Sequence, residues 1–142
     1  MRTISQILEE KGREVLSIHP GASVYNAIEV MAENGIGALM VMEGTRPVGL
    51  FSERDYARNV TLKGLSSRDT EVSEVMTRHV YCVRPEQTLE ECMALMTEKR
   101  VRHLPVTEGD RLVGIISIGD LVKSIIAEQQ FIIEQLEHYI CS

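Results

Sequence analysis

The sequence predicts an α+β fold in which two copies of one β-α-β-β-α unit pack through their sheets about a pseudo-twofold axis, followed by a long C-terminal helix. Three observations lead to this prediction. The chain matches itself at an offset of 65 residues, both copies show the same order of strand and helix patterns, and residues 121–140 contain neither Gly nor Pro. Neither copy carries enough apolar surface to fold alone, so we expect the two to share one module.

The repeat covers most of the chain. Residues 15–58 align with 80–123 without a gap, and thirteen of these 44 positions are identical, where unrelated chains would agree at roughly 3. A preface also recurs, because "ISQIL" (4–8) resembles "VSEVM" (72–76) at an offset of 68. The repeats predict the domain organisation: a first repeat over 3–63, a linker over 64–71, a second repeat over 72–127 and a helical extension over 128–142.

Each copy begins with a strand followed by a helix. Short β-branched runs that end at Pro, "VLSIHP" (15–20) and "VYCVRP" (80–85), predict the first strand. Ser23 and Thr88 then provide helix N-caps, and Thr88 forms a capping box with Glu91. Apolar residues recur behind these caps at helical spacing, which predicts an amphipathic helix in both copies.

A β-hairpin and a second helix complete each copy. The runs "ALMVME" and "HLPVTE" are typical of buried strands, and each leads through a turn to a return strand, "PVGLF" or "LVGII". Gly44 and Gly109 supply the positive φ that such turns need. The second helix starts at Ser52 in the first copy and at Ser117 in the second. Pro105 replaces Met40 of the first copy, so we expect different strand-edge geometry there.

The last helix is longer than its counterpart in the first copy. It extends ~13 residues further, which corresponds to ~20 Å at the helical rise. An apolar stripe with 4-3-4-3 spacing runs along it, made of Ile125, Gln129, Ile132, Leu136 and Tyr139 and broadened by neighbouring apolar residues. A stripe on so long an extension needs a partner, so we expect a homodimer formed partly through this helix.

Composition excludes several classes of function. The formal net charge of −6 disfavours binding to nucleic acid. The sequence contains no run of 18 apolar residues, so we expect no membrane span, and the N-terminus is unlike a secretory signal. Three cysteines without a CxxC pair favour free thiols in a reducing compartment, so we expect a cytoplasmic protein. The sequence lacks HExxH, GxSxG and P-loop motifs, and we expect no catalytic residue, no metal site and no enzymatic activity.

One phrase occurs in both copies, "GLFSERD" (49–55) and "GIISIGD" (114–120). A structural interpretation makes Ser and Asp a capping box, with the Gly allowing close packing. A functional interpretation starts from the free N–H groups of a helix N-terminus, which suit a phosphate or a polar sugar edge. A carboxylate beside them can accept hydrogen bonds from the vicinal hydroxyls of a ribose. The residues alone leave both interpretations open.

These elements together resemble a tandem pair of cystathionine-β-synthase-type (CBS) domains, the Bateman module, over about residues 3–127. The resemblance rests on the "VSEVM" preface, the Pro-plus-cap helix, the "RHLPV" strand and the repeated closing phrase, and it is strongest to stand-alone bacterial two-repeat proteins. It implies that an adenine nucleotide binds in clefts between the repeats. AMP is the first candidate, and ATP, ADP, NAD and S-adenosylmethionine are alternatives. It also implies a regulatory or signal-transducing role through an unidentified partner protein.

Carried over residue by residue, the resemblance implies two unequal ligand sites. The first joins Ser52, Arg54 and Asp55 to Val101, Arg102 and His103, with Tyr81 near the base. The second joins Ser117, Gly119 and Asp120 to Ile36, Gly37 and Ala38, with Leu16 near the base. The first has two Arg and a His, which suit a phosphorylated ligand. The second has no cation at the equivalent positions, so we expect weaker phosphate recognition there or a phosphate shared with His103.

A different class of function remains open. In this alternative the module is a structural or adaptor domain that dimerises and binds no ligand. Binding to nucleic acid, or a minor enzymatic activity, is a third hypothesis with less support from the sequence. Thermal unfolding with and without AMP, ATP and NAD distinguishes the first two, because a ligand that binds only the folded state stabilises it.

Overall fold

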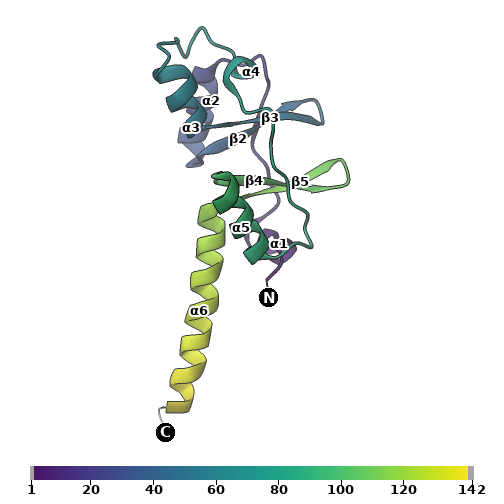
Figure 1. Cartoon of the computed structure of the whole chain (residues 1–142), viewed down its shortest axis with the longest axis vertical. Coiled ribbons are helices and arrows are strands. Elements are labelled where there is room, and N and C mark those ends of the chain that lie inside the picture. Colours follow the sequence, from purple (N-terminus) through teal and green to yellow (C-terminus); the bar gives the residue numbers. More distant parts are fainter. Residues whose placement is uncertain (1, 141–142) are drawn as a thin grey trace. The chain divides into compact units, whose positions relative to one another are not determined.

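The computed structural model describes residues 2–140, and the chain divides into two compact units (Figure 1). Glu14–Tyr81 form the first-copy unit. The second-copy unit combines the N-terminal segment up to Arg13 with the chain from Cys82 onward. Each unit has its own apolar core, and the mixture of small sheets and helices with a long last helix confirms the predicted α+β class.

A three-stranded sheet organises the first-copy unit. Its elements are β1 (Ser17–Ile18), α2 (Val24–Asn34), β2 (Ala38–Glu43), β3 (Arg46–Ser52), α3 (Glu53–Asp55), the π-helix η1 (Tyr56–Thr61) and α4 (Val72–Val75). The strand order is β1-β2-β3, with β1 parallel to β2 and β2 antiparallel to β3. Phe51 is fully buried in this unit's core.

The second-copy unit is built around a two-stranded sheet. Its elements are α1 (Ile4–Lys11), α5 (Leu89–Lys99), β4 (His103–Glu108), β5 (Arg111–Ser117) and α6 (Ile118–Ile140). The strands β4 and β5 are antiparallel. Figure 1 shows α6 as one continuous helix that extends past α5 and the sheet of its own unit. Among the described residues, no helix combines the length and apolarity needed to span a membrane.

The local signals in the sequence are confirmed in both copies. Ser23 and Thr88 accept hydrogen bonds from the backbone of the next turn, and the predicted capping box between Thr88 and Glu91 is present. Gly44 and Gly109 have φ values of 65° and 63°, as the first central residue of a type II′ hairpin turn requires. These signals could be recognised because each one satisfies a hydrogen bond or a backbone angle locally.

The two prefaces are exchanged between the copies. The helix α1 precedes the first copy in sequence, yet Ile4 and Leu8 are fully buried in the core of the second-copy unit. The Ile4 N–H donates to the Gln87 carbonyl at 2.9 Å, and in the other unit the Val72 N–H donates to the Ala22 carbonyl, also at 2.9 Å. Each preface helix therefore completes the other copy's fold, and a compact unit is not a contiguous sequence repeat.

The repeated Gly of the closing phrase marks where the preface packs. A Cβ added at Gly114 would lie 2.8 Å from a Leu8 methyl group, and one at Gly49 would lie 2.6 Å from Met76 Sδ and 2.8 Å from the Thr77 carbonyl. Leu8 and Met76 are equivalent residues of the two prefaces. The predicted close packing is thus confirmed, and the element that approaches the strand is the preface helix of the other copy.

The first strand of the second copy, predicted over 80–85, is reduced to a single bridge between Val83 and Val106. In the first copy, the Met40 N–H donates to the Leu16 carbonyl at 3.3 Å. Pro105 stands at the equivalent position and has no N–H, so this rung of the ladder cannot form. The change in strand-edge geometry expected from Pro105 is therefore the shortening of the strand predicted over 80–85. This loss explains why the second sheet has two strands and the first has three.

The helices α2 and α5 both end at a left-handed residue, Gly35 with φ 62° and Arg100 with φ 55°. Nothing lies within 4 Å of a Cβ added at Gly35, so a side chain there meets only the backbone cost of positive φ. We expect Gly35→Ala to lower the free energy of unfolding by about 1 kcal/mol. Urea denaturation measures this change, and Glu33→Ala, an exposed position in the same helix, provides the control with little expected effect. If Gly35→Ala leaves the free energy of unfolding unchanged, the left-handed cap at residue 35 is contradicted.

The second helix differs between the copies. After Ser52, α3 lasts three residues and continues as the π-helix η1, where the sequence predicted an ordinary helix. In the second copy, α6 runs for 23 residues, as predicted.

Cys92 is fully buried in the core, and burial together with the charge of Glu91 raises the pKa of its thiol to about 11. Cys141 lies outside the described residues.

Candidate functional site

The closing phrase forms a rigid corner where β3 meets α3. The Ser52 Oγ accepts a hydrogen bond from the Asp55 N–H at 3.2 Å, and the Asp55 Oδ2 accepts one from the Ser52 N–H at 3.0 Å. The Ser52 hydroxyl also lies 3.0 Å from Asp55 Oδ2. This reciprocal pair is the predicted capping box, so the structural interpretation of the phrase is confirmed at this corner.

Thr77, the residue after the second preface, holds the other oxygen of the same carboxylate. The Thr77 hydroxyl donates to Asp55 Oδ1 at 2.9 Å, while the Thr77 backbone pairs with Leu50 on β3. A carboxylate offers about four acceptor positions, and three of them are used here. Two of the three donors are hydroxyl groups, which can rotate away to leave room for hydroxyl groups of a ligand.

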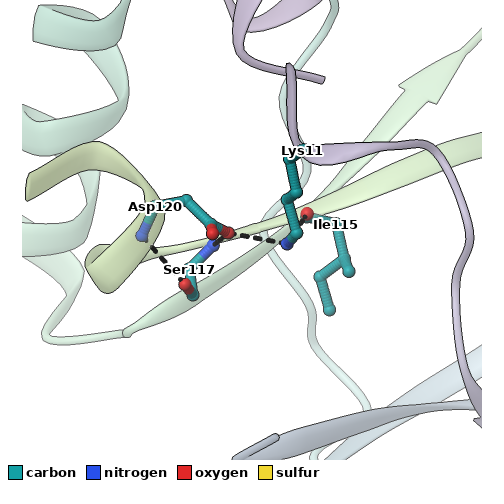
Figure 2. A network of polar contacts seen from close by, with 4 residues as sticks. All are labelled: Lys11, Ile115, Ser117 and Asp120. Atoms are coloured by element: carbon teal, nitrogen blue, oxygen red, sulfur yellow. Dashed lines mark hydrogen bonds and ion pairs between the residues drawn. The ribbon is translucent and has the colours of Figure 1, made fainter. Parts of the chain in front are cut away.

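The second corner, between β5 and α6, has the same capping geometry with a cation added (Figure 2). The Asp120 N–H donates to Ser117 Oγ at 3.1 Å, and the Ser117 N–H donates to Asp120 Oδ2 at 2.8 Å. The Lys11 ammonium donates to the same Asp120 Oδ2 and to the Ile115 carbonyl, both at 2.6 Å. The positions equivalent to Arg102 and His103 carry no cation, but α1 brings Lys11 to this corner from outside the aligned repeat.

The ion pair keeps Asp120 ionised. Burial raises the pKa of Asp120, but hydrogen bonds from Lys11 and the Ser117 backbone, together with the positive charge of Lys11, outweigh burial and hold this pKa below its usual value. The Lys11 side chain is 31% exposed and the Asp120 side chain 22% exposed. The pair is therefore half-buried, and water screens it less than it screens an ion pair on the surface.

This ion pair predicts a dependence of stability on pH. An acid whose pKa is depressed by folding stabilises the fold above its unfolded pKa of about 3.9, and this contribution is lost as the pH falls through the lower folded value. We expect Lys11→Met to cost about 1–2 kcal/mol at pH 7 and progressively less below pH 4. Urea denaturation at a series of pH values measures the difference.

The exposed pair of Arg46 and Glu43 provides the matched control for that measurement. Their side chains are 72% and 57% exposed, so Arg46→Met removes the same charge with little expected effect at any pH. Equal stability losses for both variants, or a Lys11→Met loss that does not shrink in acid, would contradict the assignment of the ion pair.

Each corner lies beside the segment that precedes the second strand of its own copy. Ala38 pairs with Ser52 and His103 pairs with Ser117, both in antiparallel register. The Glu53 N–H donates to the Gly37 carbonyl at 3.0 Å. In the second copy, the Ile118 N–H donates to the carbonyl of the exposed residue Arg102 at 2.8 Å. The phosphate-binding candidates Arg102 and His103 are thus held next to the Ser117 corner within one unit.

The remaining predicted site residues lie in the following places. Arg54 is exposed on α3, Tyr81 is 43% exposed at the end of the first-copy unit, and the Val101 N–H caps α5 through the Met96 carbonyl. Leu16 is half-buried, and Gly119 lies on the first turn of α6, where an added Cβ would meet only Ser117 Oγ, at 3.6 Å. Each predicted site draws residues from both compact units, so the joining of its two halves stays a prediction.

A cleft in the first-copy unit includes two of the predicted residues. It has a volume of about 360 Å³ and lies between α2, the loop to β2 and the start of α3. Its lining consists of Ile28, Met31, Ala32, Gly35, Ile36, Gly37 and Glu53. Ile36 and Gly37 therefore border open space, as residues that contact a ligand must.

Sequence reasoning missed Lys11 and Thr77, which follow the two prefaces and hold the corner carboxylates. Both prefaces were recognised as repeated segments, but nothing in the residue pattern placed them against the opposite copy. Lys11 and Asp120 are 109 positions apart, and only the exchange of the prefaces brings them together.

Comparison with known proteins gives consistent matches. The CBS domain family model matches residues 5–61 and 72–127. The mitochondrial CBS domain-containing protein CBSX3 of Arabidopsis thaliana is 34% identical over 97% of this chain and 71% of its own length. A solved CBS-domain protein from Burkholderia ambifaria is 53% identical, with a TM-score of 0.86 over 89% of this chain and 96% of that one.

A more distant structure shares the fold alone. The CBS domain pair of protein MJ0100 is 19% identical to this chain, with a TM-score of 0.79 over 90% of this chain and 98% of that one. The duplicated S-x-x-D corner is therefore embedded in a fold that tolerates wide divergence of sequence.

Proposed function

Because this chain belongs to the CBS domain family, with two CBS domains in tandem, we propose that it is a regulatory module that binds an adenine nucleotide. The observation that carries the proposal is the duplicated corner, in which Asp55 and Asp120 are each fixed at a helix start by reciprocal bonds to Ser52 and Ser117. Two fixed carboxylates at equivalent places suit the same chemical group, the vicinal diol of a ribose.

The proposed recognition of the sugar uses charge-assisted hydrogen bonds. A ribose offers two adjacent hydroxyl donors, and an ionised carboxylate accepts both with bonds stronger than those between neutral groups. Because each Asp is already held by its cap, little side-chain entropy is lost on binding. The CBS domain pair of MJ0100 in complex with 5-methylthioadenosine and S-adenosyl-L-methionine supports an adenosine-containing ligand for this chain too.

AMP is the proposed ligand, with ADP, ATP and NAD as alternatives. Arg54, Arg102 and His103 are the proposed phosphate contacts of the first site, since an Arg guanidinium grips phosphate with two parallel hydrogen bonds. Ligand binding alters a regulatory output only if the ligand prefers one of two conformations, so we propose that a partner protein distinguishes the free and bound states. No catalytic role is proposed for any residue.

Thermal unfolding with each nucleotide tests the proposed function. A ligand at 100 times its dissociation constant adds about 2.7 kcal/mol, which raises the midpoint by roughly 5–10 °C for a chain of this size. Asp55→Asn and Arg102→Met should reduce the shift, while Arg46→Met in the distant hairpin should preserve it. If none of AMP, ADP, ATP and NAD moves the midpoint, and none is released from freshly purified protein on mass spectrometry, the binding proposal is wrong.

The exposed face of α6 favours a second role, self-association. Between 47% and 82% of each apolar side chain on its outer part is exposed, at Ile126, Phe131, Ile132, Ile133, Leu136, Tyr139 and Ile140. So many apolar side chains on one helix are costly in water, and a second copy of the same helix would cover them. We therefore propose a homodimer formed partly through α6, which would also serve an adaptor that binds no ligand.

Truncation after Ala127 tests the role of α6 in assembly. We expect the full chain to be a dimer in multi-angle light scattering and the truncated chain to be a monomer, because the truncation removes most of the exposed stripe. Circular dichroism on the same samples shows whether the rest of the fold persists. A truncated chain that stays dimeric would contradict this role.

A further inference from the structure

The two corners differ in what occupies their carboxylates. At Asp55, two hydroxyl groups and one backbone N–H donate to the carboxylate, and no Lys or Arg is among these donors. At Asp120, the Lys11 ammonium and the Ser117 N–H both donate to the same oxygen, Oδ2. In both corners Oδ2 therefore accepts from two donors and has no free lone pair, so a diol that bridges both oxygens of either carboxylate must first displace one donor.

Lys11 is the donor that can leave. The Ser117 N–H is part of the backbone and is fixed by the capping geometry of α6. The Lys11 side chain is long and 31% exposed, and its ammonium can return to water. At Asp55 the rotation of a hydroxyl is enough to free an acceptor position. At Asp120 an ion pair must open, and charge-assisted bonds cost more to break than neutral ones.

We propose that Lys11 is an internal competitor for Asp120, which makes the second corner the low-affinity site for a ribose diol. The inference rests on the proposed function and adds an order of affinity to it: the Asp55 corner is occupied first, and the Asp120 corner responds at higher nucleotide concentration.

Isothermal titration of the full chain with AMP tests the proposal. Asp120→Asn identifies the binding phase that belongs to the second corner, and Asp55→Asn identifies the first. We expect Lys11→Met to tighten the Asp120-dependent phase about tenfold, since the diol no longer has an ion pair to open. The phase that depends on Asp55 should be unchanged. With 2′-deoxy-AMP, which lacks the diol, Lys11→Met should change the affinity little.

Two further variants separate competition from other effects. Lys11→Arg keeps the cation and should retain the wild-type affinity. Lys63→Met removes one positive charge at an exposed position in the first-copy unit and should change neither phase. Circular dichroism at the titration temperature confirms that each variant is folded, and if Lys11→Met is not, Lys11→Gln takes its place with the same expected result.

The outcomes are distinguishable. Weaker or unchanged AMP binding at the Asp120 corner in folded Lys11→Met would overturn the inference and leave the proposed function intact, with Lys11 as a positioning residue or a structural tie. If neither the wild type nor Lys11→Met binds AMP, ADP, ATP or NAD at either corner, the proposed function fails and this inference fails with it.

Discussion

Leu8→Ala is expected to lower the free energy of unfolding by about 3–4 kcal/mol, a loss typical of a fully buried Leu. The loss should be large because the side chain packs against Gly114, which has no side chain of its own to fill the cavity. The exchange of prefaces also determines where the loss appears. Leu8 belongs to the core of the second-copy unit, so amide hydrogen exchange should accelerate in α5, β4 and β5.

Met76→Ala is the matched control, because Met76 is the equivalent preface residue in the first-copy unit. Its effect should appear in β2 and β3, where Met76 packs against Gly49. Hydrogen exchange followed by mass spectrometry measures both variants. The contrary result is that Leu8→Ala accelerates hydrogen exchange in β2 and β3. That result would mean that the first preface packs on its own sequence copy and that the prefaces are not swapped between the copies.

Gly49→Ala is expected to be the other severe substitution, with a cost of about 2–3 kcal/mol. The added Cβ would lie 2.8 Å from the Thr77 carbonyl, a backbone atom whose residue is also paired with Leu50. Gly114→Ala should cost less, because its Cβ meets the flexible end of Leu8. Urea denaturation of both variants gives the comparison.

A double-mutant cycle sharpens that comparison. Gly114→Ala combined with Leu8→Ala should be more stable than the sum of the single losses predicts, since the new methyl group occupies part of the vacated space. Gly49→Ala combined with Met76→Ala should recover less, because the Thr77 carbonyl remains in place. Equal recovery in both pairs would mean that the backbone contact at Gly49 does not determine its cost.

The sequence predicted those features that depend on residues close together in the chain. The caps at Ser23 and Thr88, the turns at Gly44 and Gly109 and the long helix after Ser117 are each encoded within a few residues. The two copies strengthened every such prediction, because a signal that occurs twice at one offset is rarely accidental. The capping boxes of the closing phrase were predictable for the same reason.

Features that depend on distant contacts were not predictable in the same way. The apolar pattern of 4–8 indicates that Ile4 and Leu8 are buried, but it carries no information about which copy buries them. Lys11 could not be linked to Asp120 without that information. The π-helix after Asp55 also escaped prediction, because the spacing of apolar residues over one turn does not separate i+4 from i+5 hydrogen bonds. Pro105 is an exception. Its missing N–H is evident from the residue itself, and it removes a backbone hydrogen bond to the strand predicted over 80–85.

The exchanged prefaces also affect the order in which the chain can fold during synthesis. The 68 residues of Glu14–Tyr81 are contiguous, so the whole first-copy unit leaves the ribosome before the segments that pack against α1. The nascent helix α1 must wait for its partners through all of that stretch, about 3–14 s at typical translation rates. The apolar face of α1, which carries Ile4 and Leu8, therefore has no core to pack against during this interval.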